Sequence, residues 1–414
     1  MVICIDLKSF YASVECVLRG LDPFKVNLVV ADASRGGGSI VLAASPHIKK
    51  YGVKSRCRIY ELPQKLDIIY AKPRMRKYIE YASKIYDVYL KYVSSEDIHV
   101  YSIDEAFLDL TPYLKYYNMG AYELSKTILN DIYETTKITA VCGIGENMFL
   151  AKVALDILAK HQPDGIAVLD VDGLKEKIWD HRPITDIWGI GRGISKRLEK
   201  MGITSLGELA KYPLEKLEKE FGIVGRELFE HAHGIERSTV QEARNYLPDS
   251  KSFGHGQVLF EDYNYKDMYT VLLEMVDEVA CELVAKKLDC QLVALGIGYS
   301  KDVGGGFSRQ MTLPTKTNSR KIILDAFTKL YYDNVENLPI RRIAVRVSKL
   351  SNEDYVQVDL FTNQEKLKKE RSLYEALGEI KGRYGKNAVY LAVSDTDEGT
   401  LVKRHSLIGG HNAE

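Results

Sequence analysis

Two adjacent carboxylates, Asp104 and Glu105, interrupt an apolar run at residues 98–110. Aliphatic and aromatic residues flank them on both sides, which predicts buried strands. Burying an unpaired carboxylate is costly, so a cation or cationic partner is expected nearby. Neighbouring strand residues point to opposite faces, so the two carboxylates can share one site only at a turn. A hairpin of residues 97–101 with 106–110 would supply that turn.

A third carboxylate, Asp6, ends a short apolar strand at residues 2–5, and a helix is expected to open over residues 10–15. Three carboxylates from these two elements would form an all-oxygen site, which suits Mg²⁺ or Mn²⁺ rather than Zn²⁺. The alternative is a solvated Asp6 and a structural ion pair at the hairpin. Because both elements lie in apolar sequence, we favour the metal site.

Both stretches resemble motifs of the Y-family DNA polymerases, the translesion enzymes, and most closely those of the bacterial branch related to the SOS mutagenesis polymerases. Residues 6–15 are similar to the family's first motif and residues 102–106 to its second. The resemblance continues in order to about residue 350. It implies an α+β multidomain fold of the right-hand polymerase type, with a palm, small fingers, a helix-hairpin-helix thumb and a βαββαβ little finger.

The resemblance and the sequence periodicity together predict the domain boundaries. They are residues 1–18 and 72–160 for the catalytic palm, 19–71 for the fingers, 161–235 for the thumb, 236–250 for a linker, 251–350 for the little finger and 351–414 for a tail.

The resemblance also implies which residues would bind metal. Asp6, Asp104, Glu105 and the backbone carbonyl of Leu7 would hold two Mg²⁺ ions, with Mn²⁺ as the alternative ion. The three carboxylates would then be the catalytic residues.

The nucleotide site is implied in the same way. Phe10 and Tyr11 would lie against the incoming nucleotide, with Tyr11 as the steric gate that excludes ribonucleotides. The family holds the triphosphate with a Tyr and an Arg, and here those positions are Pro46 and Lys49. Lysine binds phosphate as a point charge, and Ser45 is expected to substitute as a hydroxyl donor.

Lys152 is a further candidate for contact with the triphosphate. It stands in a stretch of the form Gly-Ile-Gly-x-x-x-x-Leu-Ala-Lys, which is similar to the family's third palm element. A lone lysine on a helix would ordinarily be solvated, so its role rests on the resemblance.

Two segments are predicted to bind DNA. The turn with Gly189 and Gly191 precedes a basic helix with Arg192 and Lys196, which is typical of a helix-hairpin-helix that binds a DNA phosphate. In the little finger, Arg341, Arg342 and Arg346 are expected on one strand face towards the duplex backbone. The helix expected near residues 267–289 carries more acid than base and is predicted to face solvent.

The tail contains a short motif with Gln357, Asp359, Leu360 and Phe361. It resembles the peptide that docks bacterial replication proteins on the sliding clamp, where the apolar pair would fill a pocket. One more edge strand is the alternative. Residues 401–411 are expected to be flexible.

Composition limits the class of protein. The chain has 414 residues, of which 45% are hydrophobic and 28% charged, with a formal net charge of zero. Binding DNA therefore requires positive charge to be concentrated locally. No run reaches the roughly 18 apolar residues of a membrane span, and six scattered cysteines suggest reduced thiols, so we expect a cytoplasmic protein without membrane contact.

These features predict a template-directed DNA polymerase of the translesion type, which adds dNTPs to a primer 3′-OH by two-metal nucleotidyl transfer at low fidelity. Primer–template DNA, dNTPs and the sliding clamp are the expected partners, with an accessory mutagenesis subunit as a further candidate. A metal-dependent structure-specific nuclease and an inactive clamp-bound DNA-binding scaffold remain alternatives.

Overall fold

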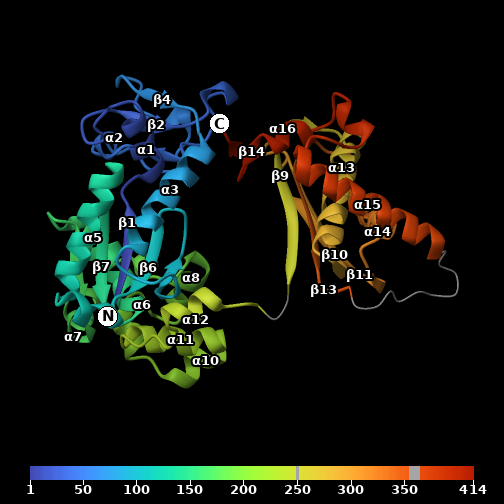
Figure 1. The fold of residues 1–414 in the computed structure, drawn as a ribbon. Coiled ribbons are helices and arrows are strands. Elements are labelled where there is room, and N and C mark those ends of the chain that lie inside the picture. The colour runs from blue at the N-terminus through green and yellow to red at the C-terminus, as the bar shows by residue number, and fades with distance from the viewer. Residues whose placement is uncertain (249–250, 354–363) are drawn as a thin grey trace. The chain divides into compact units, whose positions relative to one another are not determined.

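The computed structural model describes residues 1–248, 251–353 and 364–414. It divides into two compact units, residues 1–246 with Glu414 and residues 247–413, which we describe separately (Figure 1). Within the described ranges, every helix is too short or too polar to cross a membrane.

The first unit is built on a five-stranded sheet whose central strand is β1 (Val2–Leu7). Strand β1 pairs antiparallel with β6 (Glu105–Asp109) on one side and with β7 (Ala140–Gly145) on the other. Strand β5 (Ile98–Val100) pairs with β6 and extends one edge, and β8 (Ile166–Leu169) extends the other. The predicted hairpin around Asp104 and Glu105 is therefore confirmed.

Helices cover both faces of this sheet (Figure 1). Helix α5 (Ala121–Thr136) packs against α3 (Met75–Leu90) and against β7. Helix α6 (Met148–Val153) continues into a π-helical turn, η4 (Ala154–Leu158), and packs on β1 and β7. The remaining helices of this region are α1 (Phe10–Leu18), α4 (Thr111–Tyr117) and the short turns η3 (Ser95–Asp97) and η5 (Ala159–His161).

A small lobe lies between α1 and α3 in the sequence. Its three-stranded sheet has the order β3 (Ala43–Ala44), β2 (Leu28–Val30), β4 (Ile69–Ala71), and α2 (Pro46–Lys49) follows β3. Short turns η1 (Ala33–Arg35) and η2 (Ile59–Glu61) complete it.

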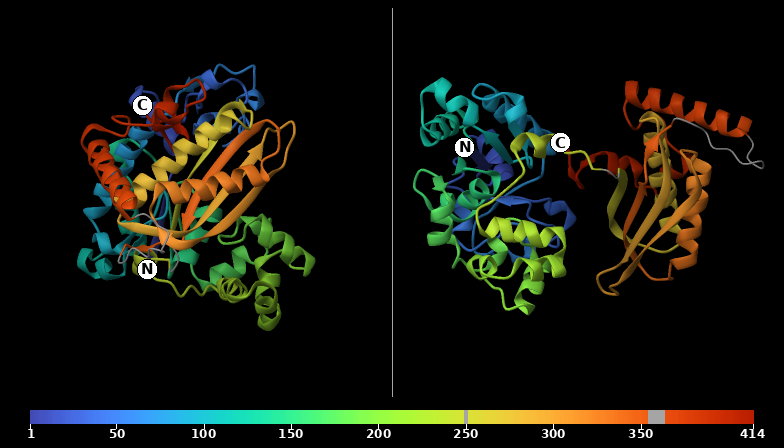
Figure 2. Two further views of the ribbon diagram at one scale, coloured as in Figure 1. Left: turned by 90° about the vertical axis from the view of Figure 1, so that its right-hand side faces the viewer. Right: turned by 90° about the horizontal axis from the view of Figure 1, so that it is seen from below.

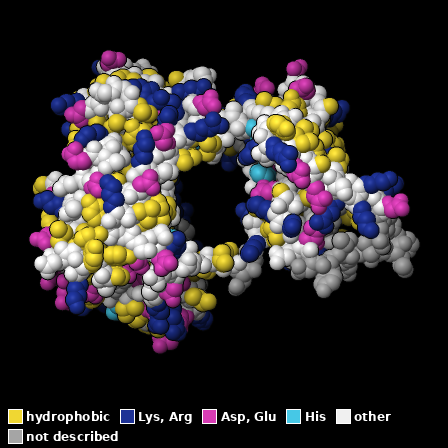
Figure 3. Space-filling model, in the orientation of Figure 1, with side chains coloured by type: hydrophobic (Ala, Val, Ile, Leu, Met, Phe, Trp, Pro, Cys, Tyr) yellow, Lys and Arg dark blue, Asp and Glu magenta, His cyan; other side chains and the backbone are white. Residues whose placement is uncertain are grey.

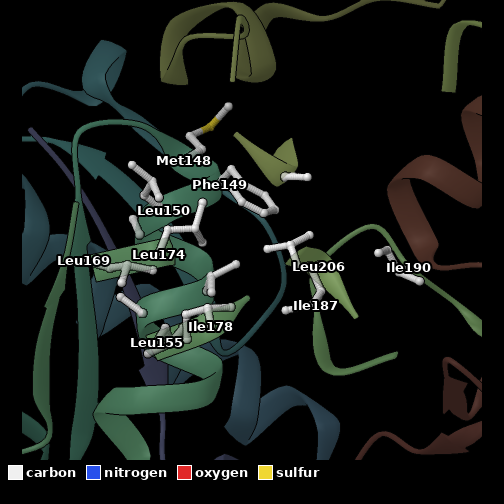
Figure 4. Packing of buried hydrophobic residues seen from close by; sticks show 14 of the residues in the cluster. Met148, Phe149, Leu150, Leu155, Leu169, Leu174, Ile178, Ile187, Ile190 and Leu206 are labelled. Atoms are coloured by element: carbon white, nitrogen blue, oxygen red, sulfur yellow. The ribbon is translucent and has the colours of Figure 1, made fainter. Parts of the chain in front are cut away.

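Short helices after β8 share one hydrophobic core with α6. Figure 4 shows Phe149 of α6 and Leu155 of η4 in this cluster, together with Leu174, Ile187 and Leu206 from the helical region that follows β8. The helical elements are α7 (Val171–Gly173), η6 (Leu174–Ile178), η7 (Ile184–Asp186), α8 (Arg192–Lys200), α9 (Leu206–Ala210), α10 (Leu214–Phe221) and α11 (Ile223–Ala232).

The segment expected to be a linker, residues 236–250, is partly folded. Thr239 Oγ1 caps helix α12 (Val240–Asn245) by accepting from Glu242 N, and Thr239 N donates to Glu242 Oε2, so the two residues form a capping box. Gln241 donates from its side-chain amide to Asp97 Oδ1 at 2.8 Å, which ties helix α12 to the turn η3. The predicted linker therefore contains a helix, which the Thr-x-x-Glu pattern signals, and the boundary between the two units follows it at residues 246/247.

The second unit has the predicted βαββαβ order. Its antiparallel sheet runs β11-β10-β12-β9, and both helices lie on the same side of it (Figure 2). The elements are β9 (Ser252–Tyr263), α13 (Asp267–Ala285), β10 (Leu288–Tyr299), β11 (Gly306–Thr317), α14 (Arg320–Asn334), β12 (Ile340–Ser348) and β13 (Ser351–Asn352).

The C-terminal segment folds onto helix α13, so the predicted flexibility of residues 401–411 and the predicted exposure of the acidic helix are both wrong. Helix α15 (Gln364–Tyr384) and helix α16 (Leu401–His405) both contact α13. The turn η8 (Ala392–Asp395) and a hairpin of β14 (Leu407–Ile408) with β15 (His411–Asn412) complete this cap.

Acids of α13 accept hydrogen bonds from residues of the C-terminal cap. Glu274 is fully buried and accepts from the amides of Thr400 at 3.1 Å and Leu401 at 3.3 Å. Arg404 pairs with Glu278 at 2.5 Å and lies 3.5 Å from Glu274. The acidic helix therefore needs the cap, because these carboxylates would otherwise lose their hydrogen-bond donors and counter-charges.

Two glycines allow helix α6 to sit close to strand β7. A Cβ on Gly143 would lie 2.1 Å from Ala151 O, and one on Gly145 would lie 2.5 Å from Ala151 N. No side chain fits at these distances, so the Gly-Ile-Gly segment serves helix–strand packing. The residue that follows Ala151 is Lys152, so the close packing also sets the position of that lysine.

We predict that Gly143→Ala destabilises the first unit by about 3 kcal/mol, because the added methyl group would overlap backbone atoms of α6. Urea unfolding of the full chain measures this. Gly193→Ala is the matched control, since its Cβ would meet nothing within 4 Å. Equal stability of the two variants would contradict the packing argument.

We predict that Arg404→Ala releases the C-terminal cap, because it removes the guanidinium group from buried Glu274 and leaves half-buried Glu278 with His405 alone of its two basic partners. Hydrogen exchange of residues 401–413 in the full chain should then lose protection worth about 3 kcal/mol. Lys286→Ala, which removes a more exposed partner of Glu282 on the same helix, is the control and should change protection by less than about 0.5 kcal/mol. Unchanged exchange in Arg404→Ala would show that the cap is held by apolar contacts alone.

Candidate active site

The predicted hairpin turn carries its two carboxylates at the start of β6. Asp104 is the last residue of the turn, and Glu105 is the first residue of the strand. The amides of Tyr101 and Ser102 both donate to Glu105 O at 3.0 Å, which closes the turn. Ser102 Oγ donates to Asp104 Oδ1 at 2.7 Å and orients that carboxylate.

The register of β1 with β6 brings Asp6 to the same place. Asp6 is the direct partner of Glu105 across the two strands, and the amide of Leu7 donates to Asp104 O at 2.9 Å. The three predicted acids thus lie together at one end of the central strand pair. In the part of the chain that the structure describes, however, no three such side chains close around a common point as a ready metal cluster.

Lysines face these carboxylates instead. Lys152 Nζ lies 2.6 Å from Glu105 Oε1 and 2.9 Å from Asp156 Oδ2. Lys160 Nζ lies 2.9 Å from Asp156 Oδ1 and 3.8 Å from Asp6 Oδ2. Acids and lysines therefore alternate along this chain of contacts, which we call the carboxylate–lysine network.

Sequence reasoning found Lys152 but missed Asp156 and Lys160. All three are spaced four residues apart, and such spacing puts side chains on one helix face. This signal was present in the sequence, although only the fold shows that the face meets Asp6 and Glu105.

Electrostatics show that the site carries excess negative charge. Burial raises the pKa of Asp6 to about 6, Lys160 opposes that shift, and Asp104 and Glu105 raise it further. Burial works against the charged form of Lys152, but hydrogen bonds to Asp156 and Glu105 raise its pKa overall. An additional cation would relieve the repulsion among the acids, and their oxygen atoms are the donor type that hard divalent ions prefer.

Tyr11 lies beside the acids, and the ring of Tyr78 supports it. Its ring stacks on Tyr78 with centroids 4.4 Å apart and an angle of 16° between the planes. Burial raises the pKa of Tyr11, and the charge of Asp104 adds to this. Phe10 is buried with 2% exposure and contacts the Tyr11 ring from inside, so the prediction that Phe10 itself meets the nucleotide is not supported.

Buried Glu15 holds Tyr78 in place. This role of Glu15 was not predicted from the sequence. Glu15 accepts from the Tyr78 hydroxyl at 2.8 Å and from Arg74 Nη2 at 2.6 Å. Glu15 is fully buried, so its charge requires these donors. A glutamate on the apolar face of the first helix was the available signal.

The small lobe contributes one lysine to the site. Lys49 Nζ donates to Ser9 Oγ at 2.8 Å, and Ser9 precedes the first helix. Burial lowers the pKa of Lys49, and the negative charge of Asp6 opposes that shift. Lys49 therefore lies in the region of the acids, and its contact with the triphosphate stays a prediction.

Ser45 does not have a free hydroxyl, so the prediction that it substitutes for the family tyrosine is wrong. It is fully buried, and its Oγ donates to Val26 O at 2.6 Å. The same oxygen accepts from Leu28 N at 3.3 Å and caps α2 through Ile48 N. Its role is to start a helix whose next residue is Pro46.

The predicted helix-hairpin-helix turn is open to solvent. Gly189 has a φ of 87°, and Gly191 starts α8 without a side-chain cap. A Cβ on either glycine would meet nothing within 4 Å, and both Arg192 and Lys196 are exposed. Basic and acidic side chains are interspersed over the face seen in Figure 3, so any DNA contact here depends on local placement.

On the sheet of the second unit, two of the three predicted arginines share the outer face. Arg342 and Arg346 are exposed and alternate with buried residues of β12. Arg341 directly precedes Arg342, so it does not share that face, and it pairs with Asp262 at 3.1 Å beside a register shift between Ile340 and Arg342. The prediction of a three-arginine face is wrong for Arg341. The predicted clamp peptide, residues 357–361, lies outside the described residues.

Comparison with known proteins gives consistent matches. Models of the impB/mucB/samB family and its C-terminal domain match residues 5–156 and 250–360, and a model described as the DNA polymerase-iota thumb domain matches residues 185–236. UvrX of Bacillus subtilis (strain 168) is 36% identical over 100% of this chain and 97% of its own length. DNA polymerase IV 2 of the same organism is 34% identical over 99% of this chain and 98% of its own length.

The fold supports the same relationship. A solved Y-family DNA polymerase chimera is similar with a TM-score of 0.67 and 26% identity, covering 85% of this chain and 99% of that structure. The shared motifs, full-length relatives and common architecture lead to one conclusion: the chain belongs to the Y family of DNA polymerases.

Proposed function

We propose that this chain is a translesion-type DNA polymerase that adds dNTPs to a primer 3′-OH under the direction of a template. The observation that carries this proposal is the meeting of Asp6, Asp104 and Glu105 at one strand end, facing lysines, in a chain with full-length relatives named DNA polymerase IV. In-line nucleotidyl transfer depends mainly on positioning and charge stabilisation, which this arrangement can supply.

The acids would hold two Mg²⁺ ions, with Mn²⁺ as the alternative. Asp6, Asp104, Glu105 and the Leu7 carbonyl are the donors, and their all-oxygen character fits hard cations. Bound cations of this kind lower the pKa of a hydroxyl nucleophile and neutralise charge on the phosphates. Burial raises the pKa of Asp6 to about 6, and the nearby charges of Asp104 and Glu105 add to this, so a bound cation would favour the charged form of these acids.

The lysines would bind the triphosphate. Lys49 and Lys152 are the predicted contacts, and Lys160 belongs with them, since it reaches Asp6 from the helix that carries Lys152. When cations occupy the acids, these lysines can turn from carboxylate to phosphate, which is an exchange between similar anionic partners.

Tyr11 would act as the steric gate. Its stack on Tyr78 holds the ring rigidly, and a rigid ring excludes a 2′-hydroxyl better than a mobile one. Tolerance of damaged templates and low fidelity would follow from the chain's membership of the Y family.

DNA would bind at two places. The amides around Gly189 and Gly191, with Arg192 and Lys196, would contact a backbone phosphate without reading sequence. Arg342 and Arg346 on the outer sheet face would contact the duplex backbone. The motif with Gln357, Asp359, Leu360 and Phe361 would dock on the bacterial sliding clamp, and an accessory mutagenesis subunit is a further candidate partner.

We predict that the protein extends a primed template with dNTPs and Mg²⁺, including past an abasic site. Asp104→Ala should lower extension by at least about a hundredfold, since it removes a cation donor. Asp172→Ala, which changes a highly exposed acid, is the control and should extend normally. No extension by the wild type, or strand cleavage in its place, would overturn the polymerase proposal.

We predict that Tyr11→Ala admits ribonucleotides, because the ring that excludes the 2′-hydroxyl is removed. Its rNTP-to-dNTP incorporation ratio should rise by about a hundredfold or more, measured by single-nucleotide extension. Tyr116→Ala, at a tyrosine with 80% exposure, is the control. An unchanged ratio in Tyr11→Ala would reject the gate and leave the polymerase proposal intact.

We predict that replacing Leu360 and Phe361 together by alanine removes stimulation by a bacterial sliding clamp. The apolar pair would fill the clamp pocket, so its loss should weaken clamp binding at least about tenfold. Extension without the clamp should stay normal. Leu373→Ala, at a leucine with 55% exposure on α15, is the control, and full stimulation of the double variant would exclude the motif as the docking peptide.

A further inference from the structure

Two aromatic residues next to the two functional turns contact each other. Tyr101 directly precedes the turn with Asp104, and Trp188 directly precedes the turn with Gly189. Trp188 Nε1 donates to Tyr101 Oη at 3.2 Å, and the rings meet edge-on with centroids 6.1 Å apart. The residues are 87 positions apart in the sequence, so the contact joins two separate elements.

The indole of Trp188 is held from both sides. Phe107, two residues after Glu105 on β6, lies 5.8 Å away, and His231 on α11 lies 6.2 Å away and nearly parallel. His231 in turn stacks on Phe149 at 4.3 Å and contacts Glu236 at 2.9 Å. The indole therefore contacts both the helical region, through His231, and the strand that carries Glu105, through Phe107.

Tyr101 is connected to the acids in two ways. Its amide donates to Glu105 O at 3.0 Å, so its backbone is part of the turn. Its ring lies 6.0 Å from Lys152 Nζ, and that ammonium group pairs with Glu105 at 2.6 Å. A shift of Tyr101 would thus move the carboxylates directly and also change the position of their lysine partner.

The contact has room to move. Tyr101 is 46% exposed, and a cavity of about 600 Å³ adjoins the pair, lined also by His99, Met148 and residues of α12. A pair that served only as core would be enclosed on all sides. Here the hydrogen bond joins two turns across a partly open region.

We propose that the Tyr101–Trp188 contact is a positioning link, through which a DNA backbone seated at the 189–191 turn sets the arrangement of Asp104 and Glu105. The inference rests on the proposed function of both turns. A phosphate at the turn fixes the backbone next to Trp188, the indole holds the Tyr101 hydroxyl, and the hairpin turn takes one arrangement. The carboxylates are then aligned only when duplex DNA is engaged.

A double-mutant cycle tests the link. Tyr101→Phe and Trp188→Phe each remove one partner of the hydrogen bond and leave an aromatic ring. We expect each to lower kcat for single-nucleotide extension about three- to tenfold, with a smaller change in KM for dNTP, and the double variant to match the single ones. Multiplying effects, or an unchanged kcat in Tyr101→Phe, would overturn the link.

The chain offers a matched control. Its other tryptophan, Trp179, donates from Nε1 to Ala232 O at 3.0 Å in the same helical region but does not take part in this contact. Trp179→Phe should therefore leave kcat unchanged. If it lowers kcat as much as Trp188→Phe does, the effect is general destabilisation and the link is rejected.

A readout without catalysis follows from the same variant. The chain has two tryptophans, so Trp179→Phe leaves Trp188 as the single fluorescent reporter. Titration with primer–template DNA, without divalent cation or dNTP, should shift its emission in a saturable way. Adding Tyr101→Phe should keep the DNA affinity and change the size of the shift, and an identical shift would overturn the link.

The outcomes separate the two levels of inference. Absence of extension or of DNA binding by the wild type would defeat the proposed function. Normal extension and normal DNA binding, with an additive cycle and an unaltered emission shift, would defeat the link alone.

Discussion

The carboxylate–lysine network is the interaction on which the catalytic half of the molecule depends. Asp6 and Glu105 are direct partners across β1 and β6, so two acids face each other at the end of buried strands. Such an arrangement repels itself unless cations intervene. In this structure Lys152 and Lys160 intervene, and Asp156 connects them. These lysines supply positive charge beside the acids, while burial, with a further contribution from Asp104 and Glu105, raises the pKa of Asp6 to about 6.

The surrounding packing serves to place that network. Gly143 and Gly145 allow α6 to approach β7, and this approach brings Lys152 to Glu105. On the other side, Glu15 fixes Tyr78, and Tyr78 carries the ring of Tyr11. Neither group of supporting residues needs to touch a substrate. Both restrict the few side chains that would, so precision at the site comes from the layer behind it.

Sequence patterns predicted what depends on local periodicity and missed what depends on tertiary partners. Alternating strands, the hairpin at Asp104 and the βαββαβ order all have local signals, and the structure has them. The burial of Ser45 could not be predicted, because its partner carbonyl on Val26 is brought near only by the fold. Arg341 was misplaced for a different reason, because neighbouring residues of a strand point to opposite faces and Arg341 therefore cannot share the face of Arg342. The charged C-terminal segment resembled a solvated tail, since its acidic partners lie more than a hundred residues earlier.

The C-terminal cap helps to explain how a chain with no net charge can expose basic residues on the outer face of β12. Helix α13 carries five of the acids of the second unit, and the cap places the cation of Arg404 against two of them, Glu274 and Glu278. Both helices lie on one side of the sheet, and the arginines Arg342 and Arg346 point from the other. Negative charge is thus neutralised where it is buried, and positive charge stays exposed where DNA is proposed to bind. Because the field near a surface depends on local charge and decays within about 10 Å at ordinary salt, this separation matters more for DNA binding than the zero total.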